Sequence, residues 1–535
     1  MSQISVNNLT FYYDGSYDNI FEDVSFQIDT DWKLGFIARN GRGKTTFLNL
    51  LMGNYEYRGK ITASVEFDYF PFPVSDKEKD TLSVIEEINP EYEFWKICRE
   101  LTLLQVEADV LYRPFHTLSN GEQTKVMLAL LFSGENRFLL IDEPTNHLDM
   151  EAREMVSDYL NRKKGFLLVS HDRAFLDKCI DHVLTINKAN IEVQQGNFSS
   201  WEENKRRQDE YELAENERLK KDIRKLETAA RQAGQWADNV EATKIGRKSE
   251  KYEKSIDRRA YIGEKSRRMQ MRRKNLERRQ NRAIDEKASL LKNIETAEDL
   301  KLFPLRHHKD ILVKLEGISI QYPAWQSGGE EGRMQAYAGQ EEESGRGRLS
   351  ENGKQILKEF GMEIRNGDRV VLRGRNGSGK SSVMKAVLAA ACSGVDSGGM
   401  TVTGTLETAS GLKVSYVPQD TGHLHGRLEE YASEYGIDET LFKALLRKLD
   451  FSRTQFDKRM EEYSGGQKKK VLIARSLCEQ AHLYVWDEPL NFIDVFSRMQ
   501  IENLILKYQP TIFMVEHDKS FVEKIGTVFI DLENF

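Results

Sequence analysis

Each half of the chain contains a glycine-rich loop of the kind that binds phosphate groups. The second half has Gly374-Arg375-Asn376-Gly377-Ser378-Gly379-Lys380-Ser381 after a short apolar run, which is the G-x-x-x-x-G-K-[ST] P-loop pattern. In a P-loop, backbone N–H groups surround the phosphates, the lysine reaches the β- and γ-phosphates, and the hydroxyl ligates Mg²⁺. The first half has Ala38-Arg39-Asn40-Gly41-Arg42-Gly43-Lys44-Thr45, in which Ala38 replaces the first glycine. We expect an ordinary backbone dihedral angle at Ala38, with nucleotide binding retained.

A pair of acidic residues follows a buried strand in each half. The apolar run 138–141 precedes Asp142 and Glu143, and the run 483–486 precedes Asp487 and Glu488. Ligands of open α/β sheets bind at the carboxyl ends of the strands, so these acids should lie beside the P-loops. The first acid of each pair can hold Mg²⁺, and the second can orient or deprotonate an attacking water.

The chain is an internal repeat. The P-loop lysines Lys44 and Lys380 are 336 positions apart, and the motifs that follow them recur at offsets of 345 or 346 positions. A repeat of this size indicates two copies of one domain. We therefore predict two α/β P-loop domains, with the first over 1–198 and the second over 301–535. Within the second, the Gly-, Glu-, Ser- and Arg-rich stretch 326–353 is predicted to be a mobile surface insertion.

Two further motifs resemble those of ABC ATPases. Leu118-Ser119-Asn120-Gly121-Glu122-Gln123 and Tyr463-Ser464-Gly465-Gly466-Gln467 resemble the LSGGQ signature, and His171 and His517 match the switch histidine. The resemblance implies that the signature of one half covers the γ-phosphate held by the P-loop of the other half. One composite site would combine Lys44, Asp142, Glu143 and His171 with Ser464 and Gly466, and the other Lys380, Asp487, Glu488 and His517 with Ser119 and Gly121. Both halves also keep the D-loop aspartate, as Asp149 and Asp494.

The motifs and the resemblance together give the candidate site residues. The catalytic residues are Glu143, Glu488, His171 and His517. The ATP-binding residues are Tyr12, Tyr13, Asn40, Gly41, Gly43, Lys44, Thr45, Thr46, Ser119, Gly121, Tyr322, Asn376, Gly377, Gly379, Lys380, Ser381, Ser382, Ser464, Gly466 and Gln467. The Mg²⁺ ligands are Thr45, Asp142, Ser381, Gln419 and Asp487. For the three tyrosines, an ordinary strand-surface position is the alternative to stacking on adenine.

The two sites are predicted to be unequal. The Q-loop glutamine of the family is present as Gln419, but Phe72 takes its place in the first half. A phenylalanine can neither ligate Mg²⁺ nor bind a water, so the first site should hydrolyse ATP differently.

The segment 199–300 has a different pattern from either half. Apolar residues recur at alternating spacings of four and three from Leu219 to Val240, which predicts a helix with a seam for a partner helix. A second helical run follows, so we predict a long antiparallel α-helical coiled-coil hairpin with its tip near 241–263. Basic residues concentrate at the tip and at the start of the return arm and could contact RNA phosphates, although a charge run is more often a solvated face. The candidate RNA-binding residues are Arg247, Lys248, Lys251, Arg258, Arg259, Arg267, Arg268, Arg272 and Arg273.

Composition narrows the class of protein. The 535 residues carry a net charge of −7, and no apolar run is long enough to cross a membrane. The start of the chain has no signal-peptide pattern, and the four cysteines have no metal or disulfide spacing, which favours a cytoplasmic protein.

Two ABC domains with a charged helical hairpin between them resemble the ABC-F family over essentially the whole chain. The resemblance implies an ATP- and Mg²⁺-dependent ATPase that enters the ribosomal tRNA exit site, with the linker reaching the P-site tRNA and the peptidyl-transferase centre. The partners would be large-subunit rRNA and tRNA, with no membrane and no DNA, and the protein would be monomeric. The PLNFID motif at 489–494 and the short stretch between Q-loop and signature resemble the antibiotic-resistance branch of Lsa/Vga type, which protects ribosomes from lincosamides, pleuromutilins and streptogramin A. The alternatives are an ABC-F translation factor without a resistance role and the ATPase subunit of a membrane transporter.

Overall fold

The computed structural model describes residues 2–13, 19–134, 136–146, 148–187, 190–242, 271, 302–322, 354–391, 399–451 and 453–532. Internal contacts divide the chain into two units. One unit combines Met1–Ser199 with Glu298–Phe535 and so holds both P-loop halves, and the other is Ser200–Ala297. The predicted insertion 326–353, nearly all of the predicted hairpin tip and return arm, and the nine candidate RNA-binding residues lie outside the described residues.

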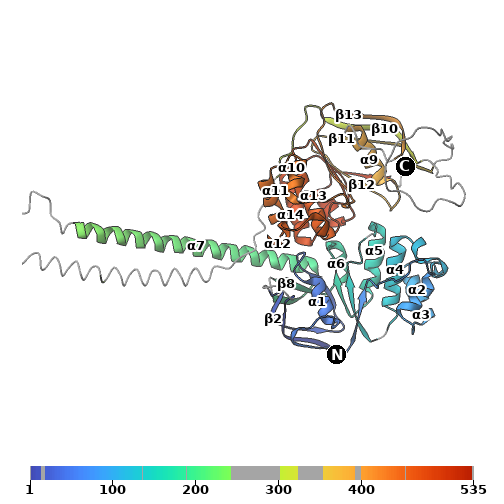
Figure 1. The fold of residues 1–535 in the computed structure, drawn as a ribbon, viewed down its shortest axis with the longest axis horizontal. Helices are drawn as coiled ribbons and strands as arrows, with labels where there is room; N and C mark the ends of the chain where they lie inside the picture. The colour runs from blue at the N-terminus through green and yellow to red at the C-terminus, as the bar shows by residue number, and fades with distance from the viewer. Residues whose placement is uncertain are drawn as a thin grey trace, which may run out of the picture. The chain divides into compact units, whose positions relative to one another are not determined.

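The N-terminal half is built on two sheets (Figure 1). A three-stranded antiparallel sheet has the order β2-β1-β4, with β1 (Gln3–Phe11), β2 (Phe21–Asp29) and β4 (Arg58–Thr62). A six-stranded sheet has the order β5-β6-β7-β3-β8-β9, with β3 (Lys33–Ile37), β5 (Glu66–Phe70), β6 (Arg137–Asp142), β7 (Phe166–Val169), β8 (His182–Asn187) and β9 (Asn190–Gln195). The central strands β6 and β7 are apolar and buried on both faces, as expected of parallel strands covered on both sides.

Helices complete this half. They are α1 (Lys44–Leu51), α2 (Thr81–Ile88), α3 (Phe94–Leu103), α4 (Asn120–Leu131), α5 (Met150–Asn161) and α6 (Arg173–Cys179), with 3₁₀ turns at Ala108–Tyr112 and Phe115–Thr117. Helices α4, α5 and α6 each begin after a Ser or Asp whose side chain accepts a backbone N–H of the first turn. This capping satisfies donors that the helix itself leaves unpaired, so the local sequence fixes where each helix starts.

The C-terminal half repeats this plan. Its antiparallel sheet has the order β11-β10-β13, with β10 (Ile311–Tyr322), β11 (Lys354–Arg365) and β13 (Thr401–Thr408). Its parallel sheet has the order β14-β15-β16-β12-β17, with β12 (Arg369–Arg373), β14 (Val414–Val417), β15 (Leu483–Asp487), β16 (Ile512–Val515) and β17 (Val528–Asp531). The helices are α9 (Lys380–Ala391), α10 (Leu428–Glu434), α11 (Glu439–Lys448), α12 (Arg453–Phe456), α13 (Gly465–Cys478), α14 (Val495–Tyr508) and α15 (Lys519–Ile525), with a 3₁₀ turn at Met460–Glu462.

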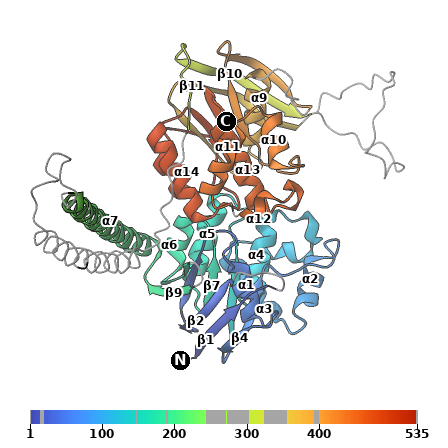
Figure 2. The same ribbon diagram turned by 60° about the vertical axis from the view of Figure 1, so that its left-hand side comes forward.

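Two apolar cores hold the C-terminal half together. One lies between the two sheets and α9, and includes Phe360, Val370 and Phe513. The other joins the helical layer of α10, α11 and α13 to the parallel sheet around Tyr484 and Trp486. In the N-terminal half, α2, α3 and α4 form a similar group of helices (Figure 2). Both faces of each parallel sheet are therefore covered, which leaves the carboxyl ends of the strands for ligands.

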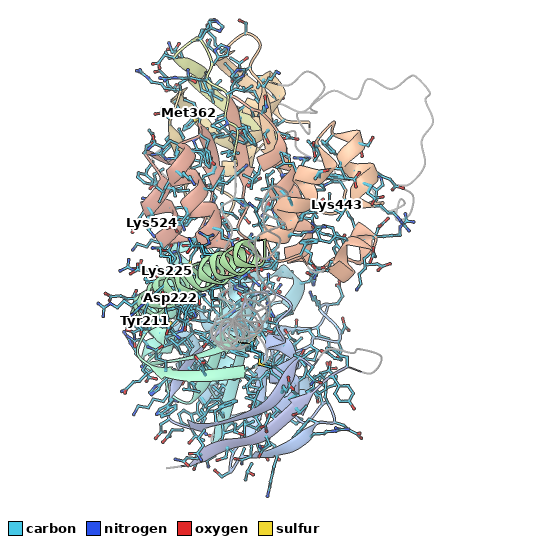
Figure 3. The ribbon with its side chains drawn as sticks, turned by 90° about the vertical axis from the view of Figure 1, so that its left-hand side faces the viewer. Tyr211, Asp222, Lys225, Met362, Lys443 and Lys524 are labelled. Atoms are coloured by element: carbon cyan, nitrogen blue, oxygen red, sulfur yellow. The ribbon has the colours of Figure 1, made fainter. Side chains whose placement is uncertain are left out.

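The second unit is described mainly by one helix. Helix α7 (Phe198–Ala242) has 45 residues, which confirms the predicted first helical run. Pairs of opposite charge spaced four residues apart stabilise its exposed surface, for example Arg207 with Glu203 at 2.5 Å. Figure 3 labels Tyr211, Asp222 and Lys225 on this helix, and the Tyr211 side chain is exposed.

Candidate functional site

The two P-loops have the same local geometry. Helix α1 begins at Lys44 and α9 at Lys380, directly after glycines with positive φ, 90° at Gly43 and 96° at Gly379. A Cβ atom on Gly379 would lie 2.7 Å from Ile356, and the positive φ also favours glycine. Each lysine Nζ donates to the carbonyl six residues earlier, over 3.1 Å to Ala38 and 2.7 Å to Gly374. Both loops are thus curled around their lysine, which is the cradle that a phosphate chain requires.

The backbone conformation at Ala38 explains why this P-loop accepts alanine in place of its first glycine. Gly374 has a φ of 142°, which L-residues rarely adopt, whereas Ala38 is absent from the residues with positive φ. The backbone of the first loop therefore takes an ordinary conformation where it tolerates a methyl group. The prediction made from the sequence is confirmed.

One tyrosine in each half lies against the P-loop helix. The hydroxyl of Tyr13 is 2.7 Å from that of Thr46, and the hydroxyl of Tyr322 is 3.2 Å from that of Ser382. Tyr12 lies instead below the guanidinium of Arg58, 5.9 Å from it. Of the two adjacent tyrosines predicted in the first half, the structure places Tyr13 at the position equivalent to Tyr322.

Both candidate catalytic glutamates have a left-handed backbone. Their φ angles are 51° at Glu143 and 46° at Glu488, and their N–H groups donate to Val169 and Val515 over 2.9 and 3.0 Å. A non-glycine residue adopts this conformation at some cost, and such residues concentrate at functional sites. The conformation turns each carboxylate away from the end of its strand, β6 or β15, toward the switch histidine of the same half.

In the C-terminal half, hydrogen bonds surround the glutamate. Gln419 donates to Glu488 over 2.8 Å and Asn491 over 2.6 Å, while His517 Nε2 lies 3.5 Å away. Burial opposes ionisation of Glu488, but these hydrogen bonds and the charge of His517 lower its pKa to about 2. The carboxylate is therefore charged at neutral pH.

The equivalent glutamate in the N-terminal half has fewer partners. Phe72 offers no hydrogen bond in place of Gln419, and Glu143 Oε1 is buried without a hydrogen bond from the described residues. Burial raises the pKa of Glu143 to about 7, against the attraction of Lys44. His171 Nε2 lies 3.2 Å from Glu143 Oε1 and 3.2 Å from Lys44 Nζ, and burial together with the Lys44 charge lowers the pKa of His171. The predicted inequality of the two sites thus has a structural counterpart.

The residues predicted to hold Mg²⁺ suit that ion in the C-terminal half. Asp487 Oδ1 is buried and lacks a hydrogen-bond partner among the described residues, and the Ser381 hydroxyl bonds to the Asp487 carboxylate. Burial and the nearby Glu488 charge raise the pKa of Asp487 to about 6, which a bound cation would reverse. A hydroxyl, a carboxylate and the amide oxygen of Gln419 are the hard oxygen ligands that Mg²⁺ prefers. In the N-terminal half, Thr45 and Asp142 supply oxygens, and Asp142 accepts a hydrogen bond from Tyr69 over 3.1 Å.

Each signature serine caps a helix. Ser119 precedes α4 and Ser464 precedes α13, and each side-chain oxygen accepts the backbone N–H three residues on. The N-terminus of each helix therefore carries free N–H groups and a positive dipole end that can face an anion.

Contacts between the halves join the N-terminal P-loop to the C-terminal signature. Asn40 Nδ2 donates to the carbonyl oxygen of Phe492 over 2.9 Å, and a Cβ on Gly466 would lie 3.1 Å from the same nitrogen. The side chain of Arg39 also pairs with Asp450. The D-loop residue Asp494 lies near enough to Lys44 to raise its pKa, against a larger lowering by burial. We call the site around Lys44 and Gly466 the first site.

The C-terminal P-loop faces the D-loop of the N-terminal half. The backbone N–H of Asn376 donates to Asp149 over 3.4 Å, and Arg375 pairs with Glu151 over 2.7 Å. Among the residues that the structure describes, a Cβ on the signature residue Gly121 would meet only Leu148 of its own half within 4 Å. We call the site around Lys380 the second site. The two halves thus face each other with opposed polarity, and in the first site the signature glycine Gly466 lies close to Asn40 of the opposite P-loop.

Sequence reasoning missed some residues of these sites. Asn491 bonds to Glu488, and Lys469 is buried with its Nζ 2.8 Å from the Pro418 carbonyl beside Gln419. A signal for Asn491 existed, because Asn146 recurs there at the repeat offset of 345. Lys469 had no such signal, since its counterpart is Thr124.

Comparison with known proteins agrees with this geometry. The family model described as "ABC transporter" matches residues 21–146 and 357–491, once in each half. The structure of the archaeal ribosome recycling factor aABCE1, solved with the stalk protein aP1, superposes with a TM-score of 0.58 at 18% identity, covering 98% of this chain and 87% of that one. The fold is therefore that of two ABC ATPase domains, and the chain is an ABC ATPase that acts on ATP.

Relatives that are similar to nearly the whole length of this chain indicate which class of ABC ATPase it resembles. The ribosome protection protein VmlR of Bacillus subtilis is 25% identical, covering 96% of this chain and 84% of the relative. The energy-dependent translational throttle protein EttA of Haemophilus influenzae is 24% identical, covering 96% and 89%. ABC transporter F family member 5 of Arabidopsis thaliana is 23% identical, covering 100% and 75%. Together these similarities support an assignment of the chain to the ABC-F family of ABC ATPases. In the described part of the chain, no helix is both long and apolar enough to cross a membrane.

Proposed function

We propose that this protein is a ribosome-binding ABC-F ATPase whose two halves close on ATP and open after hydrolysis. The observation that carries the proposal is the opposed arrangement of the halves, in which the P-loop of each meets the D-loop of the other. Binding at the ribosome is supported by similarity over 96% of the chain to a ribosome protection protein and to a translational throttle protein. Glu143 and Glu488 would act on the attacking water, and His171 and His517 would contact the γ-phosphate.

Within that function, we infer protection of the ribosome from antibiotics of the lincosamide, pleuromutilin and streptogramin A type. Helix α7 begins the segment that would reach the P-site tRNA and the peptidyl-transferase centre, and the basic residues of the predicted tip would bind rRNA. The chain between the Q-loop and the signature forms only α2, α3 and two 3₁₀ turns, without a further domain. Growth of a susceptible strain with and without this chain, measured against each drug, tests this inference. A translation factor without a resistance role would leave all three inhibitory concentrations unchanged.

Blocking hydrolysis should trap the protein on ribosomes. In the Glu143→Gln/Glu488→Gln variant both candidate bases lose their charge while ATP binding is retained, so the halves stay closed. With ATP, the double variant should co-sediment with ribosomes at several times the level of the wild type. The same variant with ADP is the matched control, because closure requires the γ-phosphate. Equal sedimentation of variant and wild type with ATP would count against ribosome binding through the closed form.

Hydrolysis at the two sites should depend differently on pH. A general base works when ionised, so its contribution is present above its pKa and is lost as the pH falls through it. In Glu488→Gln the remaining activity depends on Glu143, whose pKa of about 7 predicts a loss of rate from pH 8 toward pH 6. In Glu143→Gln the activity depends on Glu488, whose pKa of about 2 predicts a flat profile over the same range. Phosphate release measured across this range checks both, and profiles of the same shape would contradict the assignment.

A further inference from the structure

The two signature helices differ in the side chain that accepts hydrogen bonds from the signature serine. At the start of α13, Gln467 Oε1 accepts the backbone N–H of Ser464 over 3.0 Å. At the start of α4, Glu122 Oε2 accepts both the backbone N–H and the hydroxyl of Ser119, each over 2.8 Å. Glu122 and Gln467 are equivalent at the repeat offset of 345. One half therefore has a neutral amide where the other has a carboxylate.

The difference decides what each serine hydroxyl can do. The Ser119 hydroxyl gives its proton to Glu122, so it must give up a charge-assisted hydrogen bond before it can donate to a phosphate. Within the described part of the chain, the Ser464 hydroxyl is only an acceptor, from the Gln467 N–H over 3.4 Å. Its proton can therefore point at an incoming anion without breaking an existing bond.

The charge of Glu122 acts in the same direction. Burial opposes its ionisation, but hydrogen bonds from Ser119 and the nearby Arg113 cation lower the pKa of Glu122. An acidic side chain in the first turn already compensates the positive end of the helix dipole. That end is the feature that would attract the γ-phosphate, and a carboxylate beside a phosphate adds repulsion between like charges. A neutral glutamine in the same place does neither.

We propose that Glu122 is a positioning residue that holds the Ser119 signature back from the γ-phosphate, so that the second site closes on ATP less readily than the first. The contacts between the halves agree with this order. A Cβ on Gly466 of the uncharged signature would lie 3.1 Å from Asn40 of the opposite P-loop, whereas among the described residues a Cβ on Gly121 of the charged signature would meet only Leu148 of its own half. The inference rests on the proposed pairing of each signature with the opposite P-loop, but it does not depend on ribosome binding.

The test measures nucleotide affinity at one site at a time. Lys44→Ala disables the first site and Glu488→Gln prevents turnover, so equilibrium dialysis with labelled nucleotide then reports the second site. Adding Glu122→Gln should tighten ATP binding about threefold to tenfold, the range expected for removing one adverse charge at a helix N-terminus. ADP affinity should stay the same, because ADP lacks the γ-phosphate. A purely structural effect of Glu122 would change ATP and ADP binding together.

The sister half provides the reciprocal control. In a Lys380→Ala/Glu143→Gln background, Gln467→Glu should weaken ATP binding at the first site by a similar factor, again without changing ADP affinity. Both substitutions preserve the capping arrangement, because glutamine and glutamate each accept the serine N–H in this protein. Unchanged ATP affinity in Glu122→Gln, or equal changes for ATP and ADP, would overturn the proposal. Neither result would bear on ribosome binding, which co-sedimentation tests separately.

Discussion

Glu488→Gln should lower the rate of ATP hydrolysis by about 100-fold or more, whereas Glu143→Gln should lower it by less than about tenfold. The expected difference follows from the surroundings of the two carboxylates. Glu488 is held by Gln419 and Asn491 and has a pKa of about 2, so at neutral pH it is a fixed and fully charged base. Glu143 has a pKa of about 7 and is partly protonated under the same conditions. Most turnover should therefore come from the second site.

Steady-state phosphate release by purified protein, with saturating ATP and Mg²⁺, measures this difference. Glu523→Gln is the matched control, because it makes the same chemical change on an exposed part of α15 and should leave the rate unchanged. Circular dichroism of each variant confirms that the fold is intact. Equal losses in Glu488→Gln and Glu143→Gln would show that the hydrogen bonds from Gln419 and Asn491 do not set the rate.

Slow closure and fast hydrolysis at the second site are compatible. Glu122 acts on the signature serine before the site has closed, whereas Gln419 and Asn491 act on the catalytic glutamate once a water is in place. A site that closes late but hydrolyses promptly would make its closure the step that commits the protein to release. The first site, which closes readily but has a partly protonated base, would hold its ATP for longer. The internal repeat has therefore diverged into two sites with complementary tasks under this proposal.

The sequence predicted those features that depend on local pattern. Both P-loops and the strands that end in Asp142 and Asp487 were predicted correctly, because each depends on residues close together in the chain. The tolerance of Ala38 followed from the same local geometry. The first helix of the linker was also predicted from its period.

Features that depend on residues far apart in the chain could not be predicted from the sequence. Phe72, in place of the Q-loop glutamine, indicated that the two sites differ. The pKa of Glu143, however, depends on the burial of its side chain, which only the folded chain produces. The left-handed backbone at Glu143 and Glu488 occurs where their N–H groups bond to the last residues of β7 and β16, which no property of a glutamate indicates. The first signature differs from LSGGQ at both Asn120 and Glu122, and only the structure shows that Glu122 is the residue that bonds to Ser119.

The ion pair between Arg173 and Glu502 joins residues 329 positions apart and was equally invisible in the sequence. Arg173 begins α6 in the N-terminal half, and Glu502 lies on α14 in the C-terminal half, where Lys524 of α15, labelled in Figure 3, also pairs with it. The side chains of Arg173 and Glu502 are only 5% and 2% exposed. At the repeat offset the positions equivalent to Arg173 and Glu502 are Lys519 and Ser157, so this tie occurs on one side only.

Glu502→Leu should lower the free energy of unfolding by about 3–5 kcal/mol, because it removes one charge of a buried ion pair. The double variant Arg173→Met/Glu502→Leu should recover most of that loss, since two apolar side chains can pack where the ion pair was. Chemical denaturation of the wild type, both single variants and the double variant measures the coupling. Lys524→Met is the control: its side chain is 54% exposed, so its loss should cost far less. Additive losses in the double variant would show that the pair does not tie the halves together, whereas strong coupling would show that it does.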